Sequence, residues 1–328
     1  MAFPVQYSTL SATALGAFLQ QQYDFGQVEC RYKLRGVSDT YEITTPNRKF
    51  ILKIFRSSHR SEEEIKGEIE LLQHLRQQQI GVAASVADKH GEHLQIFEAP
   101  EGLRPGVLYE FAPGKPVIEQ DDQHIIRSGE YLAQLHNQTE GLQLKYNRKA
   151  YTINTLLHQP MEAIRIAYAD LPDEFAAQQQ MADATLQALE QLDLNQLSHG
   201  YCHYDFMPKN FHFDEAGNIM LFDFDFAGPG WLANDIASYA AYLTLMNLSE
   251  EETRRRFLVF TDAYRKLRAI TETEWAILPH LGFLFWTFYL KFQFENFDDM
   301  TNVYFGPRFL RERIKLIRKH LDLFGAVI

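Results

Sequence analysis

His203-Tyr204-Asp205-Phe206-Met207-Pro208-Lys209-Asn210 lies past the middle of the chain, and Asp223-Phe224-Asp225 follows after one short hairpin. Asp205 and Asn210 are five positions apart on a predicted loop, and Asp223 ends the next apolar segment. Phosphoryl-transfer sites use this spacing to hold an acceptor hydroxyl and magnesium. The two motifs therefore predict a phosphoryl-transfer site.

The chemistry of the transfer explains why these residue types stand together. A transferring phosphoryl group needs little covalent help, so the protein must position the nucleophile and neutralise charge on the phosphate oxygens. We expect Asp205 to be the catalytic base that accepts the hydrogen bond of the substrate hydroxyl. We expect Asn210 and Asp223 to bind Mg²⁺, which prefers hard oxygen ligands and substrate phosphates. If Asp223 does not bind the metal, Asp225 is the next candidate ligand.

The flanking sequence favours a catalytic loop over an ordinary polar turn. Asp, Asn and Pro form turns whatever the function, and a chance His-x-Asp-x4-Asn arises in roughly a few per cent of chains this long. Here residues 197–202 and 211–213 have the composition of strands on either side of the loop, and a turn at 214–218 precedes the apolar residues 219–222. Asp223 is thus expected at the end of a strand.

At these residues the chain resembles the aminoglycoside phosphotransferase and choline kinase family, from about residue 34 to about residue 240. Pro208 and the segment 223–228, Asp-Phe-Asp-Phe-Ala-Gly, are most similar to type II homoserine kinases. Tyr204 departs from the Gly that is usual in the small-molecule kinases of the family. The resemblance implies an α+β, protein-kinase-like fold of two lobes, with a small antiparallel-sheet N-lobe and a mostly helical C-lobe.

The resemblance also implies that Asp235 braces the catalytic loop without touching substrate. The alternative is an ordinary N-cap for the helix that runs to about Leu245, and both roles are compatible. His136 closes an earlier helix in a Leu-Ala-x-Leu-His style common in the family. We expect it to be a packed structural histidine outside the site.

Residues 27–112 are expected to bind the nucleotide, beginning with strands at 28–34, 40–44 and 49–55. The intervening segment 35–39 predicts a turn whose backbone N–H groups, with Ser38 and Asp39 as candidates, cover phosphates. A plain hairpin turn is the alternative. In the third strand Lys53 interrupts an apolar run, and alternation alone does not decide whether it faces solvent or phosphate.

The next helix favours a functional role for Lys53. Ser61 and Glu64 form a predicted capping box, and apolar residues then recur at helical spacing. Glu68 falls within that apolar stripe, whereas Glu70 falls on the opposite face. A carboxylate there needs a partner, and we expect a Lys53–Glu68 pair that orients phosphates. Glu64 lies on the same side as Glu68 but is explained by capping.

The segment 107–114 predicts a buried strand stopped by Pro113 and Gly114. The family resemblance makes this the hinge, where backbone groups near Glu110 and Ala112 pair with the adenine edge. We therefore expect an N-lobe at residues 1–114 and a C-lobe at residues 115–328, with the catalytic loop, metal site and acceptor-binding helices.

The second half predicts seven helices, at 121–137, 161–169, 174–192, 232–246, 250–269, 273–295 and 307–323. In the sixth, one face carries four aromatic residues, Phe285, Phe288, Tyr289 and Phe292. Trp286 lies beside this face, and the acids Glu295, Asp298 and Asp299 follow it. Aromatics followed by acids are typical of a pocket for an ammonium group. A core helix with a solvated acidic end is the alternative.

Composition narrows the class of protein. The chain has 328 residues, 46% of them hydrophobic, which is enough for two lobes with cores. The net charge of −11 argues against nucleic acid as a partner. The N-terminus lacks the pattern of a signal peptide. The apolar stretch 276–290 is shorter than the ~20 residues that span a bilayer. The two cysteines suggest neither a disulfide framework nor a zinc site. We expect a cytoplasmic protein that binds no membrane.

These observations together predict transfer of the γ-phosphate of ATP, with Mg²⁺, to a hydroxyl of a small metabolite. Homoserine-like amino alcohols are the first candidates for the acceptor, and choline, ethanolamine, sugars and aminoglycosides are the next. One alternative is a protein Ser/Thr kinase of the bacterial stress-response type, although residues 224–234 are too few for a long activation segment. The other is a pseudokinase that binds nucleotide without turnover.

Overall fold

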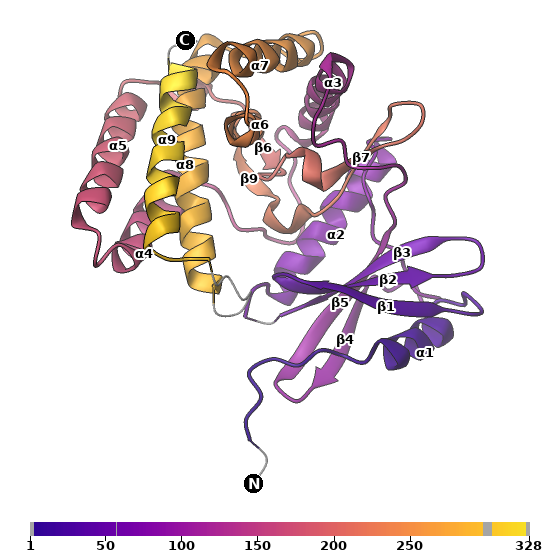
Figure 1. Ribbon diagram of the computed structural model, residues 1–328. Helices are drawn as coiled ribbons and strands as arrows, with labels where there is room; N and C mark the ends of the chain where they lie inside the picture. The colour runs from indigo at the N-terminus through magenta and orange to yellow at the C-terminus, as the bar shows by residue number, and fades with distance from the viewer. Residues whose placement is uncertain (1–2, 57, 298–303, 326–328) are drawn as a thin grey trace. The chain divides into compact units, whose positions relative to one another are not determined.

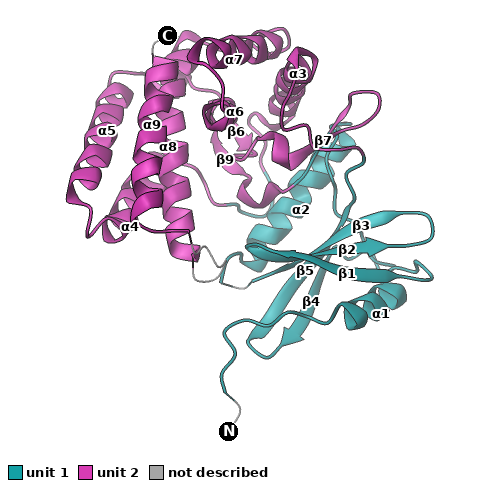
Figure 2. Ribbon diagram, viewed as in Figure 1, with its two compact units in different colours: residues 1–113, 144–148, 220–222 teal, residues 114–143, 149–219, 223–328 magenta. Residues whose placement is uncertain are grey.

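The computed structural model describes residues 3–56, 58–297 and 304–325, which fall into two compact units (Figures 1 and 2). The first unit draws on residues 1–113, 144–148 and 220–222, and the second on 114–143, 149–219 and 223–328. The main junction lies beside the lobe boundary expected at residue 114. Two short segments that the sequence assigned to the C-lobe instead belong to the first unit.

An antiparallel sheet forms most of the first unit. Its strands are β1 (Glu29–Arg35), β2 (Ser38–Thr44), β3 (Lys49–Phe55), β4 (Leu94–Ala99) and β5 (Gly102–Glu110), in the order β1-β2-β3-β5-β4. Alternation along β3 buries Phe50, Leu52 and Ile54 on one face. Lys53 therefore points to the opposite face of the sheet.

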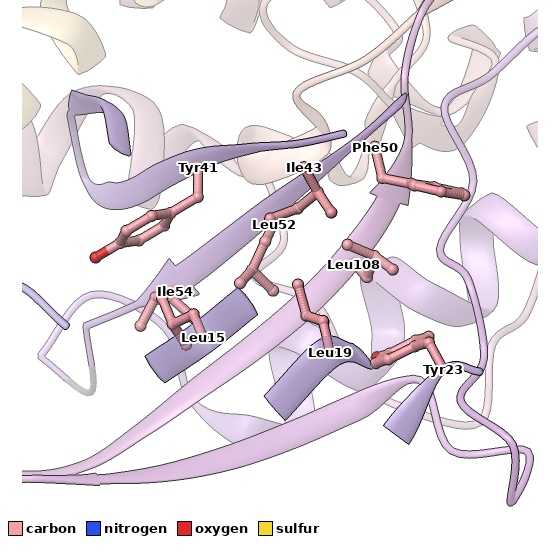
Figure 3. Packing of buried hydrophobic residues seen from close by; sticks show 9 residues of the cluster. All are labelled: Leu15, Leu19, Tyr23, Tyr41, Ile43, Phe50, Leu52, Ile54 and Leu108. Carbon is pink, nitrogen blue, oxygen red and sulfur yellow. The ribbon is translucent and has the colours of Figure 1, made fainter. Parts of the chain in front are cut away.

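Helix α1 (Ala12–Gln22) covers the face that carries Leu52. Leu15 and Leu19, one helical turn apart, pack with Tyr23 against side chains of the sheet (Figure 3). The sequence analysis missed α1, because Gly16 and the run Gln20-Gln21-Gln22 weaken its apolar pattern.

Helix α2 (Glu62–Gln77) begins with the expected capping box. Glu64 N donates to Ser61 Oγ at 3.2 Å, and Ser61 N donates to Glu64 Oε2 at 3.0 Å. Residues 144–148 of the same unit lie against this helix. Gly67 permits their approach, since a Cβ at this position would lie 3.0 Å from the backbone oxygen of Tyr146.

The second unit is mostly helical. Its α-helices in the described residues are α3 (Asp122–Thr139), α4 (Gln159–Ala167), α5 (Pro172–Glu190), α6 (Ala233–Leu245), α7 (Glu250–Arg265), α8 (Glu272–Asn296) and α9 (Pro307–Gly325). All seven helices expected here are present, and their ends differ from prediction by at most four residues. Strands β6 (His199–Cys202) and β9 (Gly228–Trp231) pair antiparallel. Strand β7 (Phe211–Phe213) pairs with β8 (Ile219–Leu221), whose last two residues are counted with the first unit.

Helix α8 is the core of this unit. It packs against α4, α5, α6 and α9, and its buried side chains point to all sides. A helix that is apolar all round is normally a buried one. Among the described helices, none has the length and hydropathy needed to cross a bilayer.

His320 of α9 is buried in the packing between α9, α8 and α6. Its Nδ1 lies 2.9 Å from Thr244 Oγ1, and it is 0% exposed. Gly282 of α8 makes room for the ring, because a Cβ there would lie 1.8 Å from His320 Nε2. Burial lowers the pKa of His320 from 6.5 to about 3. The folded protein thus keeps this ring neutral.

His320 should make the protein less stable in acid. Below pH 6.5 the unfolded chain binds a proton that the folded protein excludes, so the free energy of unfolding should fall as pH decreases toward 3. Well above pH 6.5 His320 is neutral in both states and does not lower the free energy of unfolding. By pH 5.5 it should lower this free energy by about 1.4 kcal/mol. Urea denaturation of the wild type and of His320→Asn at pH 7.5 and 5.5 measures it.

The His320→Asn variant should lose this part of the pH dependence, although it will be less stable at pH 7.5. His90→Asn, at an exposed position, is the control and should keep the wild-type slope. An unchanged slope in His320→Asn would show that other groups cause the acid sensitivity.

Candidate active site

The loop between β6 and β7 brings Asp205 and Asn210 together. Asn210 Nδ2 donates to the backbone oxygen of Asp205 at 2.8 Å and to its carboxylate Oδ2 at 2.7 Å. One turn of 3₁₀ helix, Pro208–Asn210, folds the chain back to allow both bonds. Because its nitrogen is committed to Asp205, Asn210 has its amide oxygen left to offer a cation.

The two carboxylate oxygens of Asp205 have different surroundings. Oδ2 accepts from Asn210 and also lies 2.8 Å from Lys209 Nζ. Oδ1 is buried, and no donor in the described part of the chain makes a hydrogen bond of ordinary geometry with it, although the Tyr289 hydroxyl lies near this carboxylate. A buried acceptor without a partner costs about 1–3 kcal/mol. Oδ1 is therefore the oxygen able to receive a hydrogen bond from a substrate.

Two residues of the site have left-handed backbone. Tyr204 and Asp223 both have φ of 65°, a conformation that costs a non-Gly residue about 1–2 kcal/mol. Glycine adopts this φ without strain, which accounts for the Gly usual at the position of Tyr204 in the resembling family. Here the ring of Tyr204 stacks on Tyr151 with centroids 3.8 Å apart, and this packing offsets the strain.

Asp235 braces the catalytic loop, as the family resemblance implied. Its carboxylate accepts from His203 N at 2.8 Å and from Tyr204 N at 2.6 Å. His136 Nε2 lies 3.2 Å from Asp235 Oδ2, and His136 Nδ1 lies 2.8 Å from Tyr264 Oη. His136 is thus a structural residue, as expected. The N-cap alternative is wrong, because α6 begins two residues earlier, at Ala233.

Carboxylate and amide oxygens, the side-chain groups of Asp223, Asp225 and Asn210, are of the kind that a hard divalent cation takes as ligands. Asp223 follows β8 and Asp225 lies two residues later in a 3₁₀ turn, with Asp225 3% exposed. In residues 3–56, 58–297 and 304–325 no group of three or more His, Cys, Asp or Glu side chains is arranged to hold a metal. Magnesium fits such a donor set, since it commonly takes one or two carboxylates and completes its shell with phosphates and water.

Tyr289 of α8 lies close to the carboxylates of the site. Burial raises its pKa well above the ordinary value, and the negative charges of Asp205 and Asp223 raise it further. Phe226, from the segment after Asp223, packs against Tyr289 with centroids 5.6 Å apart. Aromatic side chains from α8 therefore contact the segment that follows Asp223 and Asp225.

Trp286 does not share this position. It is 3% exposed, and the guanidinium carbon of Arg313 from α9 lies 4.7 Å from its ring centroid. The sequence placed Trp286 beside the aromatic face of this helix, and its contact with Arg313 makes it part of the packing between α8 and α9. Residues three positions apart lie about 60° from each other around a helix axis, so Trp286 and Tyr289 can pack against different neighbours.

Of the three acids that follow the aromatic residues, the structure describes Glu295, which lies at the surface. The side chain of Glu295 is 49% exposed, and its carboxylate lies 3.5 Å from Lys291 Nζ. This ion pair matches the alternative of a solvated helix end. Asp298 and Asp299 lie outside the described residues.

Lys53 and Glu68, in the first unit, are linked through Tyr109 of β5. Lys53 Nζ lies 6.0 Å from the Tyr109 ring centroid, and Tyr109 Oη donates to Glu68 Oε1 at 2.8 Å. Arg148 NH1 lies 3.6 Å from Glu68 Oε2. Glu68 is 1% exposed, as its place in the apolar stripe predicted. The direct Lys53–Glu68 pair stays a prediction.

Ser38 and Asp39 are not turn residues, as the sequence suggested, but the first residues of β2. The carboxylate of Asp39 is fully buried and lies 3.2 Å from Arg104 and 3.7 Å from Arg35. Arg104 also donates to the backbone oxygen of Phe55 at 2.8 Å. Because the Asp39 side chain is engaged in this core network, it is not available to a phosphate.

Glu110 and Ala112 lie at the end of β5 and just beyond it. Glu110 N donates to Ala84 O at 2.9 Å, and its carboxylate lies 3.0 Å from Arg76 and 3.5 Å from Arg48. The side chain of Glu110 is therefore held by arginines, and its carbonyl oxygen is the group to consider for a base edge.

A model of the phosphotransferase enzyme family matches residues 34–270. The chain belongs to this family. It is therefore a phosphotransferase of the kinase class expected from its motifs, with an alcohol group as acceptor.

Named relatives of this phosphotransferase are kinases. The amicoumacin kinase of Bacillus subtilis is 29% identical over 221 residues, which cover 66% of this chain and 63% of that protein. The homoserine kinase of Cupriavidus pinatubonensis is 25% identical over 333 residues, covering 94% and 96% of the two chains.

A solved structure of amicoumacin kinase hAmiN in complex with AMP-PNP, Ca²⁺ and Ami superimposes with a TM-score of 0.74 at 22% identity. The match covers 97% of this chain and 94% of that one. The likeness establishes the α+β, protein-kinase-like fold that the resemblance implied.

Three residues of this phosphotransferase carry contacts that sequence reasoning missed. Tyr109 and Arg148 hold Glu68, and Lys209 holds Asp205. Lys209 stands inside the quoted motif, four residues after Asp205, so its cationic side chain was a readable signal. Tyr109 and Arg148 gave none, because their partner lies 41 and 80 positions away in the sequence.

Asp235 should be essential for the loop. Asp235→Ala leaves the N–H groups of His203 and Tyr204 buried without an acceptor, at a cost of about 1–3 kcal/mol each. We expect a large drop in the urea midpoint and loss of activity. Tyr264→Phe removes only the hydroxyl that contacts His136, which in turn contacts Asp235. It should lower the free energy of unfolding by about 1 kcal/mol. Equal stability of Asp235→Ala and Tyr264→Phe would contradict the bracing role.

Proposed function

We propose that this phosphotransferase moves the γ-phosphate of ATP to a hydroxyl of a small metabolite, with Mg²⁺ as the metal. The observation that carries the proposal is the carboxylate of Asp205. One of its oxygens is held by Asn210 and Lys209, while the other is buried and accepts no hydrogen bond of ordinary geometry from the described residues. An acceptor hydroxyl would satisfy that oxygen and be oriented by it.

The residues of the second unit divide the chemistry between them. Asp205 accepts the hydrogen bond of the acceptor hydroxyl and takes its proton as the new ester bond forms. Asn210, through its amide oxygen, and Asp223, through its carboxylate, hold the metal. When bound, Mg²⁺ would neutralise charge on the phosphate oxygens. Asp235 keeps the loop in the shape that presents Asp205.

The residues of the first unit bind the nucleotide. Lys53 pairs with phosphate oxygens, and Glu68 orients it, with Tyr109 between them. Backbone groups of Ser38 and Asp39 cover the phosphates. The carbonyl oxygen of Glu110 and the backbone of Ala112 pair with the adenine edge.

The acceptor is an amine-bearing alcohol of the homoserine type. The homoserine kinase relative, which aligns over 94% of this chain, supports this choice. Choline, ethanolamine, sugars and aminoglycosides are the next candidates for the acceptor. A protein acceptor is disfavoured, because residues 224–231 form a short 3₁₀ turn and a strand paired with β6, with no long segment available for phosphorylation.

A panel of hydroxyl metabolites, assayed for ADP release, tests the function directly. Release with one acceptor class identifies the substrate. Nucleotide binding without release from any acceptor would favour a pseudokinase. A mass increase of the intact protein or of added proteins after incubation with ATP would favour a protein kinase.

Asp205→Asn should lower turnover by about 100-fold or more, the scale of losing a positioned base. The affinity for ATP should stay nearly the same, because this residue contacts the acceptor. Steady-state ADP release and nucleotide titration measure the two quantities. Glu215→Gln, an exposed acid on the following hairpin turn, is the control for a lost charge. A variant with most of its activity would refute the assignment of Asp205.

Asp223→Ala should abolish the metal dependence of nucleotide binding, because it removes the carboxylate assigned to the metal. Titration of labelled ATP with and without Mg²⁺ separates this effect from general unfolding. Asp225→Asn, two residues away, is the matched comparison. If Asp223→Ala keeps the metal dependence of the wild type and Asp225→Asn loses it, the metal is held by Asp225.

A further inference from the structure

Lys209 occupies an unusual position for a lysine that is half exposed. It lies on the 3₁₀ turn Pro208–Asn210, and its side chain is 53% exposed. Its Nζ nevertheless reaches 2.8 Å from Oδ2 of Asp205, whose side chain is 4% exposed. The ammonium therefore sits at the border between solvent and the buried carboxylate.

The contact with Asp205 uses only part of what Lys209 offers. An ammonium group has three protons on a flexible four-carbon stem. Asp205 Oδ2 already accepts from Asn210 at 2.7 Å, so it keeps a donor when Lys209 leaves. The exposed stem allows the ammonium to move by a few ångströms without disturbing the core.

The reaction proposed above places the phosphoryl group within reach of this ammonium. A hydroxyl bound to Asp205 Oδ1 lies about 2.6–3.2 Å from it, and the phosphorus must approach that hydroxyl to about 3–3.5 Å. Lys209 Nζ, already 2.8 Å from the other oxygen of the same carboxylate, needs only a short movement to contact a phosphoryl oxygen. A cation there stabilises the charge of the transferring group.

We propose that Lys209 is a further catalytic residue. Its ammonium rests on Asp205 in the nucleotide-free protein and moves to a γ-phosphoryl oxygen in the reacting complex. This inference rests on the proposed function. The acceptor oxygen forms the bond to phosphorus, the bond to the bridging oxygen of ADP breaks with its electron pair, and the hydroxyl proton passes to Asp205. Lys209 keeps all three of its protons and contributes charge only.

Nucleotide affinity separates this role from a merely local effect on Asp205. A contact with the γ-phosphoryl group should strengthen binding of AMP-PNP with Mg²⁺ and leave binding of ADP with Mg²⁺ unchanged. We expect Lys209→Met to weaken AMP-PNP by about 10-fold to 100-fold, the range of a charge-assisted hydrogen bond. Its turnover should fall by a similar factor. Lys209→Arg, which keeps the charge, should retain most of the AMP-PNP affinity.

Two results would overturn the proposal. One is equal affinity of Lys209→Met and wild type for AMP-PNP. The other is a Lys209→Met variant whose only change is a shifted acid limb of the pH–rate profile, since this would mean that Lys209 acts through Asp205. A failure of the proposed function looks different, because no acceptor would then stimulate ADP release by the wild type. Urea midpoints of the variants should match that of the wild type.

Discussion

A buried carboxylate in α6 holds the catalytic loop in the shape on which the site depends. Asp235 binds two successive N–H groups, at His203 and Tyr204, and the second belongs to a residue with left-handed backbone. Asp205 is the next residue, so the direction of its carboxylate follows from this pair of bonds. Helices α3 and α7 hold Asp235 in turn, through His136 and Tyr264. Packing between helices thereby fixes the backbone that precedes Asp205.

Charge in the site is balanced locally before any nucleotide binds. Asp205 has a lysine and an amide as neighbours, whereas Tyr289 has a pKa raised by burial and by the nearby carboxylates. Glu68 in the first unit is likewise buried with a hydroxyl and a guanidinium group beside it. Each of these two acids has its donors within its own unit.

Sequence reasoning succeeded where chemistry or local geometry fixes residue spacing. Asp205 and Asn210 are five apart because one short turn must bring them together, and the capping box at Ser61 is equally local. It failed where a distant partner decides. Asp39 is part of the core network because Arg104, 65 residues later in the chain, pairs with it. Trp286 likewise packs against Arg313, a residue of the following helix. The left-handed backbone at Tyr204 gave no signal either, since a ring stacked on Tyr151 replaces the glycine that would have indicated it.

The division of the chain bears on how the protein is made. Leu221 completes the first unit, because Ala83 N donates to Leu221 O at 2.9 Å and Leu221 N donates to Gly81 O at 2.8 Å. A ribosome reaches this residue only after about two thirds of the 328 codons have been read. Domains generally fold in the order of their synthesis, but here the N-terminal sheet must wait for a segment embedded in the later unit. We therefore expect the first unit to be completed late in translation, and a fragment that ends near residue 113 to lack the segment that Gly81 and Ala83 bind in the whole protein.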